Sequence, residues 1–368
     1  DYIEAYLRRA GLHAWRQSPM LALADLDRFF SASPTRQSLS PASSFKANLA
    51  LAHYLKASAL IDIDLYPQAD EEIAASLAFD PNFAEAQFLQ CRLAALRKEI
   101  DVANQRLSTF IERYPTHLPA YQSRAVVRAD LGDYLASIAD CEVVLKANPQ
   151  DSWSNYLKAR MLYRLSRSQE ALPFVDAAIK ASPKNIRFHT QRAEINHALR
   201  RFDAALIDTD TIVRLQPDNP LNLINRARMR GNNGDWAGVQ KDIDEGFRWE
   251  HTAEPAVRAE LYFYRGILRY DRGEHAAGKE DCLIASRLMP EERRYQQALQ
   301  KMSNRAIADM VTSVLDVMER NAKNPATQNR VGRPETPSGN PDALYELWQY
   351  SNEMAESERR EQFRMNNR

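Results

Sequence analysis

Two small residues, twelve positions apart, recur along most of the chain with a period of about 34 residues. We number the positions of each copy so that the small residues fall at positions 8 and 20. Two antiparallel helices approach closely only where both carry small side chains, so each copy is predicted to fold as a helical hairpin. Position 8 is occupied by Ala10, Ala57, Cys91, Ala125, Ala159, Ala193, Ala227 and Gly266. Position 20 is occupied by Ala22, Ala69, Ala103, Ser137, Ala171, Ala205, Val239 and Gly278.

Prolines and glycines punctuate the same register. Proline falls at position 32 and cannot continue a helix, so it ends the second helix of each hairpin. Gly132, Gly234 and Gly273 stand between the two small residues, where a glycine past a helix end is typical of the turn between helices. The prolines that follow the period are Pro81, Pro115, Pro149, Pro183 and Pro217, with Pro34 and Pro290 as outlying members.

A period of about 34 residues is that of the tetratricopeptide repeat. Residues 121–149, YQSRAVVRADLGDYLASIADCEVVLKANP, resemble the consensus of that family almost throughout. The resemblance covers residues 3–36 and 50–290, although tryptophan is absent at position 4 and five extra residues, 254–258, precede the last hairpin. It implies an all-α fold, a right-handed superhelical solenoid of about eight hairpins followed by C-terminal capping helices.

The register also divides the chain into segments. A hydrophobic stripe after the last repeat is read as a helix that caps the solenoid, with a dimer face as the alternative. The stripe consists of Ile307, Met310, Val311, Val314, Leu315 and Met318. The expected segments are a first hairpin (1–36), an insert (37–49), seven consecutive hairpins (50–290), a capping helix (291–322), a linker containing proline and glycine (323–341), and an amphipathic helix (342–368).

The last predicted helix carries an apolar cluster in its first two turns. Such a cluster is too apolar to stand alone in water on a short helix, so we expect it to dock on a protein surface. Docking onto the chain's own solenoid is favoured, and docking into the groove of a second copy is the alternative. The cluster consists of Leu344, Tyr345, Leu347, Trp348 and Tyr350.

Charged residues follow the repeat as well. In six copies position 7 is basic and position 23, sixteen residues later, is acidic. On antiparallel helices these side chains can meet across the hairpin, and we interpret them as partly buried ion pairs that fix the helix register. An anion-binding ladder is the rival interpretation. The pairs are Arg9/Asp25, Lys56/Glu72, Arg124/Asp140, Arg192/Asp208, Arg226/Asp242 and Arg265/Asp281.

The resemblance also implies a partner-binding groove. In the family, positions 2, 5, 9, 12 and 13 of the first helices line the concave face, and here they combine aromatic rings with arginine, which is typical of interface anchors. Ordinary solvated helix faces are the equal alternative. The lysine/asparagine clamp with which some members hold acidic chaperone tails is not reproduced. The candidate residues are Phe88, Arg92, Trp153, Tyr156, Arg160, Tyr163, Arg164, Arg187, Glu194, His197 and Arg228.

Composition narrows the functional classes. The 49 basic and 49 acidic residues balance, which disfavours a nucleic-acid binder or a protein that adheres to anionic membranes. No run of 18 apolar residues occurs, so no membrane span is expected. Cys91, Cys141 and Cys282 are widely separated and are read as reduced thiols, which favours a cytoplasmic location. Because the sequence begins at Asp1, a periplasmic or exported location after removal of a leader is the alternative.

Catalytic signatures are missing. The sequence contains no HExxH, GxSxG or P-loop motif, and its seven histidines do not cluster with cysteines at metal-ligand spacing. We therefore expect no cofactor, no metal and no enzyme activity. The favoured interpretation is a scaffold or adaptor that binds a peptide or helical segment of another protein. An oligomeric component of an assembly, such as a secretion or envelope machine, is the alternative, and a repeat-type RNA binder is third.

Overall fold

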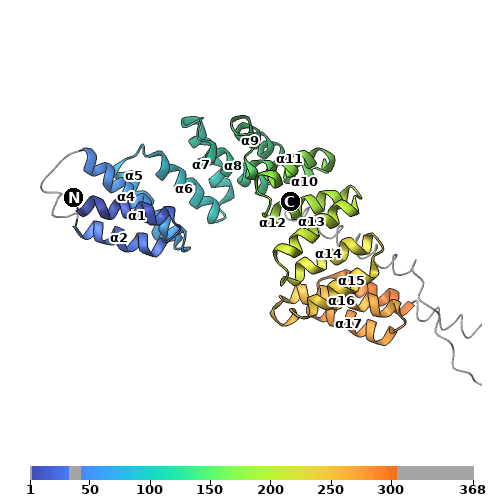
Figure 1. Cartoon of the computed structure of the whole chain (residues 1–368). Coiled ribbons are helices and arrows are strands. Elements are labelled where there is room, and N and C mark those ends of the chain that lie inside the picture. The colour runs from blue at the N-terminus through green and yellow to red at the C-terminus, as the bar shows by residue number, and fades with distance from the viewer. Residues whose placement is uncertain (1, 33–42, 305–368) are drawn as a thin grey trace, which may run out of the picture. The chain divides into compact units, whose positions relative to one another are not determined.

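The computed structural model describes residues 2–32 and 43–304, and all regular secondary structure in these residues is helical (Figure 1). The expected all-α solenoid of helical hairpins is confirmed. The predicted linker, the C-terminal helix with its five apolar residues, and residues 305–322 of the capping helix lie outside the described residues. The helices are α1 (Tyr2–Trp15), α2 (Pro19–Ala32), α4 (Ser43–Ile61), α5 (Tyr66–Phe79), α6 (Ala84–Leu96), α7 (Ile100–Arg113), α8 (Leu118–Asp130), α9 (Tyr134–Ala147), α10 (Ser152–Arg164), α11 (Ser168–Ala181), α12 (Ile186–Ala198), α13 (Phe202–Leu215), α14 (Pro220–Asn232), α15 (Trp236–Phe247), the 3₁₀ helix η1 (Glu250–Thr252), α16 (Pro255–Asp271) and α17 (His275–Leu288), followed by helical residues 293–304.

The helices form two compact units, Asp1–Arg167 and Ser168–Arg368. In the first unit, α1/α2, α4/α5, α6/α7 and α8/α9 pair as hairpins, and α10 packs against α9. In the second, α11 packs against α12, and α12/α13, α14/α15 and α16/α17 are hairpins. We call α1, α4, α6, α8, α10, α12, α14 and α16 the first helices, and their successors the second helices. Within each unit a first helix packs on the second helix that precedes it, which stacks the hairpins of that unit on one another.

The small residues at positions 8 and 20 lie where the two helices of a hairpin touch. Ala125 and Ser137 are both buried, and the Ser137 hydroxyl donates to the Ala125 carbonyl at 2.7 Å. In the last hairpin both positions are glycine. A Cβ on Gly266 would come within 2.8 Å of the Gly278 carbonyl oxygen, and one on Gly278 within 2.7 Å of the Gly266 oxygen. Any side chain at either position would therefore push α16 and α17 apart.

The turn inside each hairpin requires a left-handed residue. Position 15 has a positive φ in all eight described copies, yet only three of them use glycine, which adopts this conformation without strain. The residues are Gln17, Asp64, Lys98, Gly132, Ser166, Arg200, Gly234 and Gly273.

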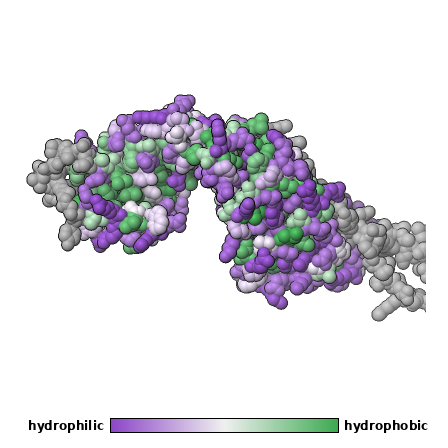
Figure 2. Space-filling model, turned by 45° about the horizontal axis from the view of Figure 1, so that its top comes forward, coloured by the Kyte–Doolittle hydropathy of each residue, from purple (hydrophilic) through white to green (hydrophobic). Residues whose placement is uncertain are grey.

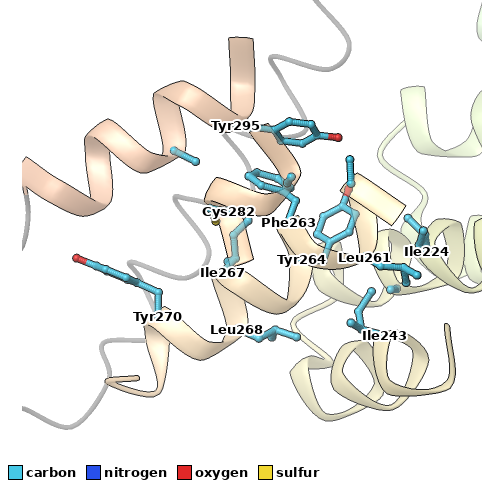
Figure 3. Close-up of a cluster of buried hydrophobic side chains, with 14 of the residues drawn as sticks. Ile224, Ile243, Leu261, Phe263, Tyr264, Ile267, Leu268, Tyr270, Cys282 and Tyr295 are labelled. Atoms are coloured by element: carbon cyan, nitrogen blue, oxygen red, sulfur yellow. The ribbon is translucent and has the colours of Figure 1, made fainter. Parts of the chain in front are cut away.

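The last hairpin is covered by residues 293–304. Tyr295 lies against Phe263, with ring centroids 4.9 Å apart (Figure 3). The Tyr270 hydroxyl donates to the Met302 carbonyl at 2.6 Å. Tyr295 and Met302 are fully buried. Residues 293–304 thus shield an apolar side of α16 and α17 from water.

Two insertions lengthen helices. Helix α4 begins at Ser43, so residues 43–49 of the predicted insert form its first two turns. The extra residues 254–258 lie at the start of α16, which has 17 residues against 13 in α14. Both insertions thus extend the N-terminal end of a first helix.

Candidate functional site

The six predicted ion pairs between positions 7 and 23 are all present. In four of them an arginine donates through two nitrogens to both oxygens of one aspartate, the geometry in which guanidinium and carboxylate bind most strongly. Arg9 meets Asp25 in the same way, and Lys56 lies 2.9 Å from Glu72. The shortest nitrogen–oxygen distances in the four are 2.8 Å for Arg124/Asp140, 2.7 Å for Arg192/Asp208, 2.6 Å for Arg226/Asp242 and 2.8 Å for Arg265/Asp281.

Each of these carboxylates has a second basic partner that the sequence reasoning missed. In two hairpins it is a histidine at position 4: His53 binds Glu72, and His189 lies 2.8 Å from Asp208. In the other four it is a basic residue at position 11. The sequence does carry a signal for these second partners. Each copy with the position-7/position-23 pair has either a histidine at position 4 or a basic residue at position 11. The position-11 contacts are His13 to Asp25 (3.7 Å), Arg128 to Asp140 (2.8 Å), Arg230 to Asp242 (2.9 Å) and Arg269 to Asp281 (2.9 Å).

The position-7 side chains also reach backwards to the preceding hairpin. Arg192 donates to Asp176 at 2.7 Å, and Arg226 to Asp210 at 3.1 Å, in each case at position 25 of the preceding second helix. Lys158, which has Phe174 in place of an acid in its own repeat, pairs with Glu142 at 2.7 Å. Position 7 therefore joins successive hairpins, which supports the structural interpretation of these residues over an anion-binding ladder.

The arginines at position 9 of the first helices differ from those at position 7 in their ion pairing. Arg92, Arg160 and Arg228 occupy position 9 in alternate repeats, and none of them takes part in an ion pair within residues 2–32 and 43–304. Arg92 is exposed, whereas Arg160 and Arg228 are half-buried. The Nε of Arg228 is buried and has no hydrogen-bond partner among the described residues.

The aromatic candidates of the first unit lie partly inside it. Tyr156 is only 9% exposed, and Phe88 packs between Phe110 and His117, with centroid distances of 5.6 and 4.7 Å. Position 5 therefore packs into the helix array instead of lining a surface, because it turns toward the start of the next first helix. Trp153 is half-exposed, and its ring centroid lies 5.2 Å from that of Tyr156.

The remaining candidates lie nearer to the solvent. In the first unit Tyr163 is half-buried and Arg164 is exposed. In the second unit Arg187 is exposed, Glu194 is half-buried, and the half-buried His197 contacts Phe202 at 5.6 Å. Each unit thus presents polar and charged groups along the first helices that it contains.

The family of the chain follows from these repeats and from comparison with known proteins. A family model described as tetratricopeptide repeat matches residues 123–186 and 156–220. Residues 123–220 are thus tetratricopeptide repeats, and the other described hairpins follow the same register. Tetratricopeptide folds generally serve as protein-interaction scaffolds and are generally not catalytic.

Solved tetratricopeptide structures share the fold at low sequence identity. A tetratricopeptide repeat protein from Parabacteroides merdae is 16% identical with a TM-score of 0.51, covering 69% of this chain and 98% of its own. The C-terminal part of a repeat protein from Cytophaga hutchinsonii is 10% identical with a TM-score of 0.54, covering 66% and 98%. Pseudomonas aeruginosa pilF is 11% identical with a TM-score of 0.50, covering 57% and 95%.

The cysteines of this tetratricopeptide-repeat protein are buried and free. Burial raises the pKa of the Cys91 thiol to about 11 and those of Cys141 and Cys282 to about 12. A thiol reacts and binds metal as thiolate, so these side chains act as small apolar residues at neutral pH. In the part of the chain that the structure describes, no group of histidine, cysteine and acidic residues could hold a metal ion. No helix in that part is long and apolar enough to cross a membrane.

Proposed function

We propose that the protein is a non-catalytic scaffold that holds a peptide or helical segment of another protein along its first helices. The observation that carries the proposal is the contrast between two rows of arginine on those helices. At position 7 every arginine is paired with a carboxylate, whereas Arg92, Arg160 and Arg228 at position 9 are without an ion pair in the described residues.

The unpaired row has the chemistry of a binding surface. An arginine has five donors in a fixed planar arrangement and binds a carboxylate strongly when water is excluded. The Nε of Arg228 is buried and has no hydrogen-bond partner among the described residues. Trp153, half-exposed beside Tyr156, offers an apolar contact in the first unit. Within the first unit, Arg92, Arg160 and Trp153 suit a partner segment with carboxylates and aromatic or aliphatic side chains.

The proposal is tested by charge reversal. Arg160→Glu combined with Arg164→Glu should leave helicity and melting nearly unchanged, because Arg160 has no ion pair in the described residues and Arg164 is exposed, where charged contacts add little stability. Binding of the partner should weaken about fivefold or more, as expected when an anchor is lost. The partner is first identified by affinity purification and mass spectrometry, and its affinity is then measured by titration calorimetry.

A matched control is Lys146→Glu combined with Lys180→Glu, which reverses the same charge on exposed sites of two second helices, α9 and α11. This control should bind the partner normally. Equal affinity of both double variants and the native chain would refute binding along the first helices.

A further inference from the structure

Three consecutive turns of the first unit expose large hydrophobic side chains. These turns join the two helices of the hairpins α4/α5, α6/α7 and α8/α9, and each spans positions 13–19 of its repeat. We call residues 62–68, 96–102 and 130–136 the turn face. Its exposed large hydrophobic side chains are Leu65 (40% exposed), Leu96 (42%), Val102 (39%), Leu131 (39%) and Leu135 (64%).

The matching turns of the second unit are different. In residues 198–204, 232–238 and 271–277 the large hydrophobic side chains are half-buried, and they are Leu199, Phe202 and Trp236. The exposed large hydrophobic side chains that the structure describes in the second unit are Ile207 and Leu221, and both lie within helices. Figure 2 shows hydrophobic patches on the surface of the first unit. Because the same fold forms without exposed hydrophobic residues in these turns, their presence in the first unit indicates a surface that a partner covers.

The three turns of the turn face lie next to one another. Arg97 of the second turn donates to a carboxylate oxygen of Asp70 and to the Tyr66 carbonyl, both at 3.1 Å, at the start of the helix that follows the first turn. Ile100 of the second turn packs against the buried cluster that contains Val127, in the last turn of α8 just before the third turn. The turn face is thus continuous along one edge of the first unit.

Acidic residues surround these hydrophobic side chains. The turn face contains six acidic and two basic residues, and one of the bases, Arg97, is already paired with Asp70. The matching turns of the second unit contain four acidic and three basic residues, so the acidic excess belongs to the first unit. Four acids of the turn face are exposed and take part in no ion pair within the described residues: Asp62, Glu99, Asp101 and Asp130.

We propose that the turn face binds a basic amphipathic helix of another protein. The apolar side of the bound helix covers Leu96, Val102 and Leu135, and its lysines or arginines lie beside Asp101 and Asp130. Burial of hydrophobic surface supplies affinity, and the opposite charges select the partner and speed its association. This surface is separate from the arginines at position 9, which precede the turns on the first helices and suit carboxylates instead.

Two other occupants match the charge of the turn face poorly. A second copy of the chain would bring the same acidic turns against one another, and like charges repel. The C-terminal segment of the chain has its hydrophobic cluster beside Asp342 and Glu346, and residues 334–358 contain no lysine or arginine. A basic segment of another protein is therefore the occupant that the charges favour.

Binding is tested with a designed probe, a peptide of about 18 residues with leucine at helical spacing and lysine elsewhere, long enough to form a helix on the surface. A matched peptide has glutamate in place of every lysine, so its apolar side is the same. The full chain should bind the lysine peptide at least about tenfold more tightly than the glutamate peptide, and added salt should reduce the difference. The lysine peptide should also slow hydrogen exchange at the starts of α7 and α9. Equal affinity for the two peptides, or protection confined to the second unit, overturns the proposal.

The hydrophobic contact is tested by shortening one side chain. Leu135→Ser should weaken binding of the lysine peptide at least about fivefold, because it removes the most exposed hydrophobic side chain of the turn face. Ile207→Ser is the matched control, since Ile207 is 65% exposed on α13 of the second unit, and this variant should bind the peptide normally. Thermal melts followed by circular dichroism verify that both variants fold. An equal effect of the two substitutions contradicts binding at the turn face.

The charges are tested by neutral substitutions of similar shape. Asp101→Asn combined with Asp130→Asn should weaken binding of the lysine peptide about fivefold and make it less sensitive to salt. Asp203→Asn combined with Asp218→Asn removes two exposed charges of the second unit and should leave binding unchanged. If both double variants bind the peptide as the native chain does, the proposal fails.

The other possible occupants are tested without any peptide. Hydrogen exchange of the turn face that slows as the chain concentration rises, and that Leu135→Ser restores, would assign the face to a second copy. Faster exchange of the turn face after deletion of residues 305–368 would assign it to the chain's own C-terminal segment. Either result overturns the proposal.

Discussion

Arg192 donates to both carboxylate oxygens of Asp208, at 2.9 and 2.7 Å, across the hairpin that contains them. Its remaining nitrogen donates to Asp176 of the preceding second helix at 2.7 Å. Asp208 is 1% exposed and also accepts from His189, whereas Asp176 is exposed. The guanidinium of Arg192 thus joins a buried carboxylate of its own hairpin to a solvated carboxylate of the preceding one.

The two acids should differ in their contribution to stability. Asp208→Ala leaves Arg192 and His189 without their shared acceptor, so the free energy of unfolding should fall by about 3 kcal/mol. Asp176→Ala removes only a solvated partner and should cost less than about 1 kcal/mol. Urea denaturation followed by circular dichroism measures both. Equal and small losses of unfolding free energy in the two variants would mean that the buried ion pair stabilises the hairpin no more than the solvated one.

The left-handed turn residue at position 15 offers a route to higher stability. Lys98→Gly and Arg200→Gly should each raise the free energy of unfolding by about 0.5–1 kcal/mol, because glycine adopts a positive φ without the Cβ clash. Gly234→Ala should lower it by about 1 kcal/mol for the same reason. Lys180→Gly, inside α11, is the control and should destabilise. Thermal melts of the four variants test the sign of each change.

Close contact of α16 and α17 should make their glycines irreplaceable. Gly278→Ala places a Cβ 2.7 Å from the Gly266 oxygen, and the helices must separate, so we expect a loss of about 2 kcal/mol or more. Gly11→Ala is the matched control. Its Cβ would meet only Leu55, at 3.9 Å, and the better helix propensity of alanine should stabilise α1 by up to about 1 kcal/mol. Denaturant midpoints that move equally would contradict this difference.

Acid should weaken the first two hairpins. The hydrogen bond from Arg9 holds the pKa of Asp25 below its usual 3.8. Burial opposes ionisation of Glu72, but hydrogen bonds from His53 and Lys56 outweigh it and hold that pKa below 4.5. A carboxyl whose pKa is lowered by folding stabilises the fold above its unfolded pKa. The stabilisation is lost as the pH falls through the folded pKa.

Stability should therefore begin to fall as the pH drops below the ordinary carboxyl pKa values of 4.5 for Glu72 and 3.8 for Asp25. Asp25→Asn should be less stable than the native chain at pH 6 and should lose less on acidification. Hydrogen exchange of α1 and α2 at pH-corrected rates separates these hairpins from the rest of the chain. Identical acid sensitivity of the variant and the native chain would exclude Asp25 as a source.

The C-terminal prediction concerns residues outside the described part of the chain. If the segment containing Trp348 occupies a surface that a partner needs, deletion of residues 340–368 should expose that surface. Affinity for the partner and binding of a hydrophobic dye should then both rise. Unchanged affinity and dye response after deletion would mean that the segment does not compete with the partner.

The sequence determined the hairpins and their internal pairs. The repeat period fixes which small residues face each other, at positions 8 and 20. It also brings a base at position 7 next to an acid at position 23, because the two helices of a hairpin are antiparallel and the turn between them is short. Arg9 and Asp25 could therefore be paired without coordinates. The second partners of the same acids, such as Arg128 and His189, also recur at fixed positions, but the sixteen-residue spacing gives each acid a partner already and does not point to a second one.

Only the tertiary structure decided which surface positions are free. Arg226 and Arg228 are two residues apart on α14, yet the first lies between two aspartates and the second has no ion pair in the described residues. Burial of Tyr156 and exposure of Leu12 likewise depend on what the neighbouring helices cover. The repeat pattern gives equivalent positions the same number, whereas packing between the described hairpins decides which of them are buried.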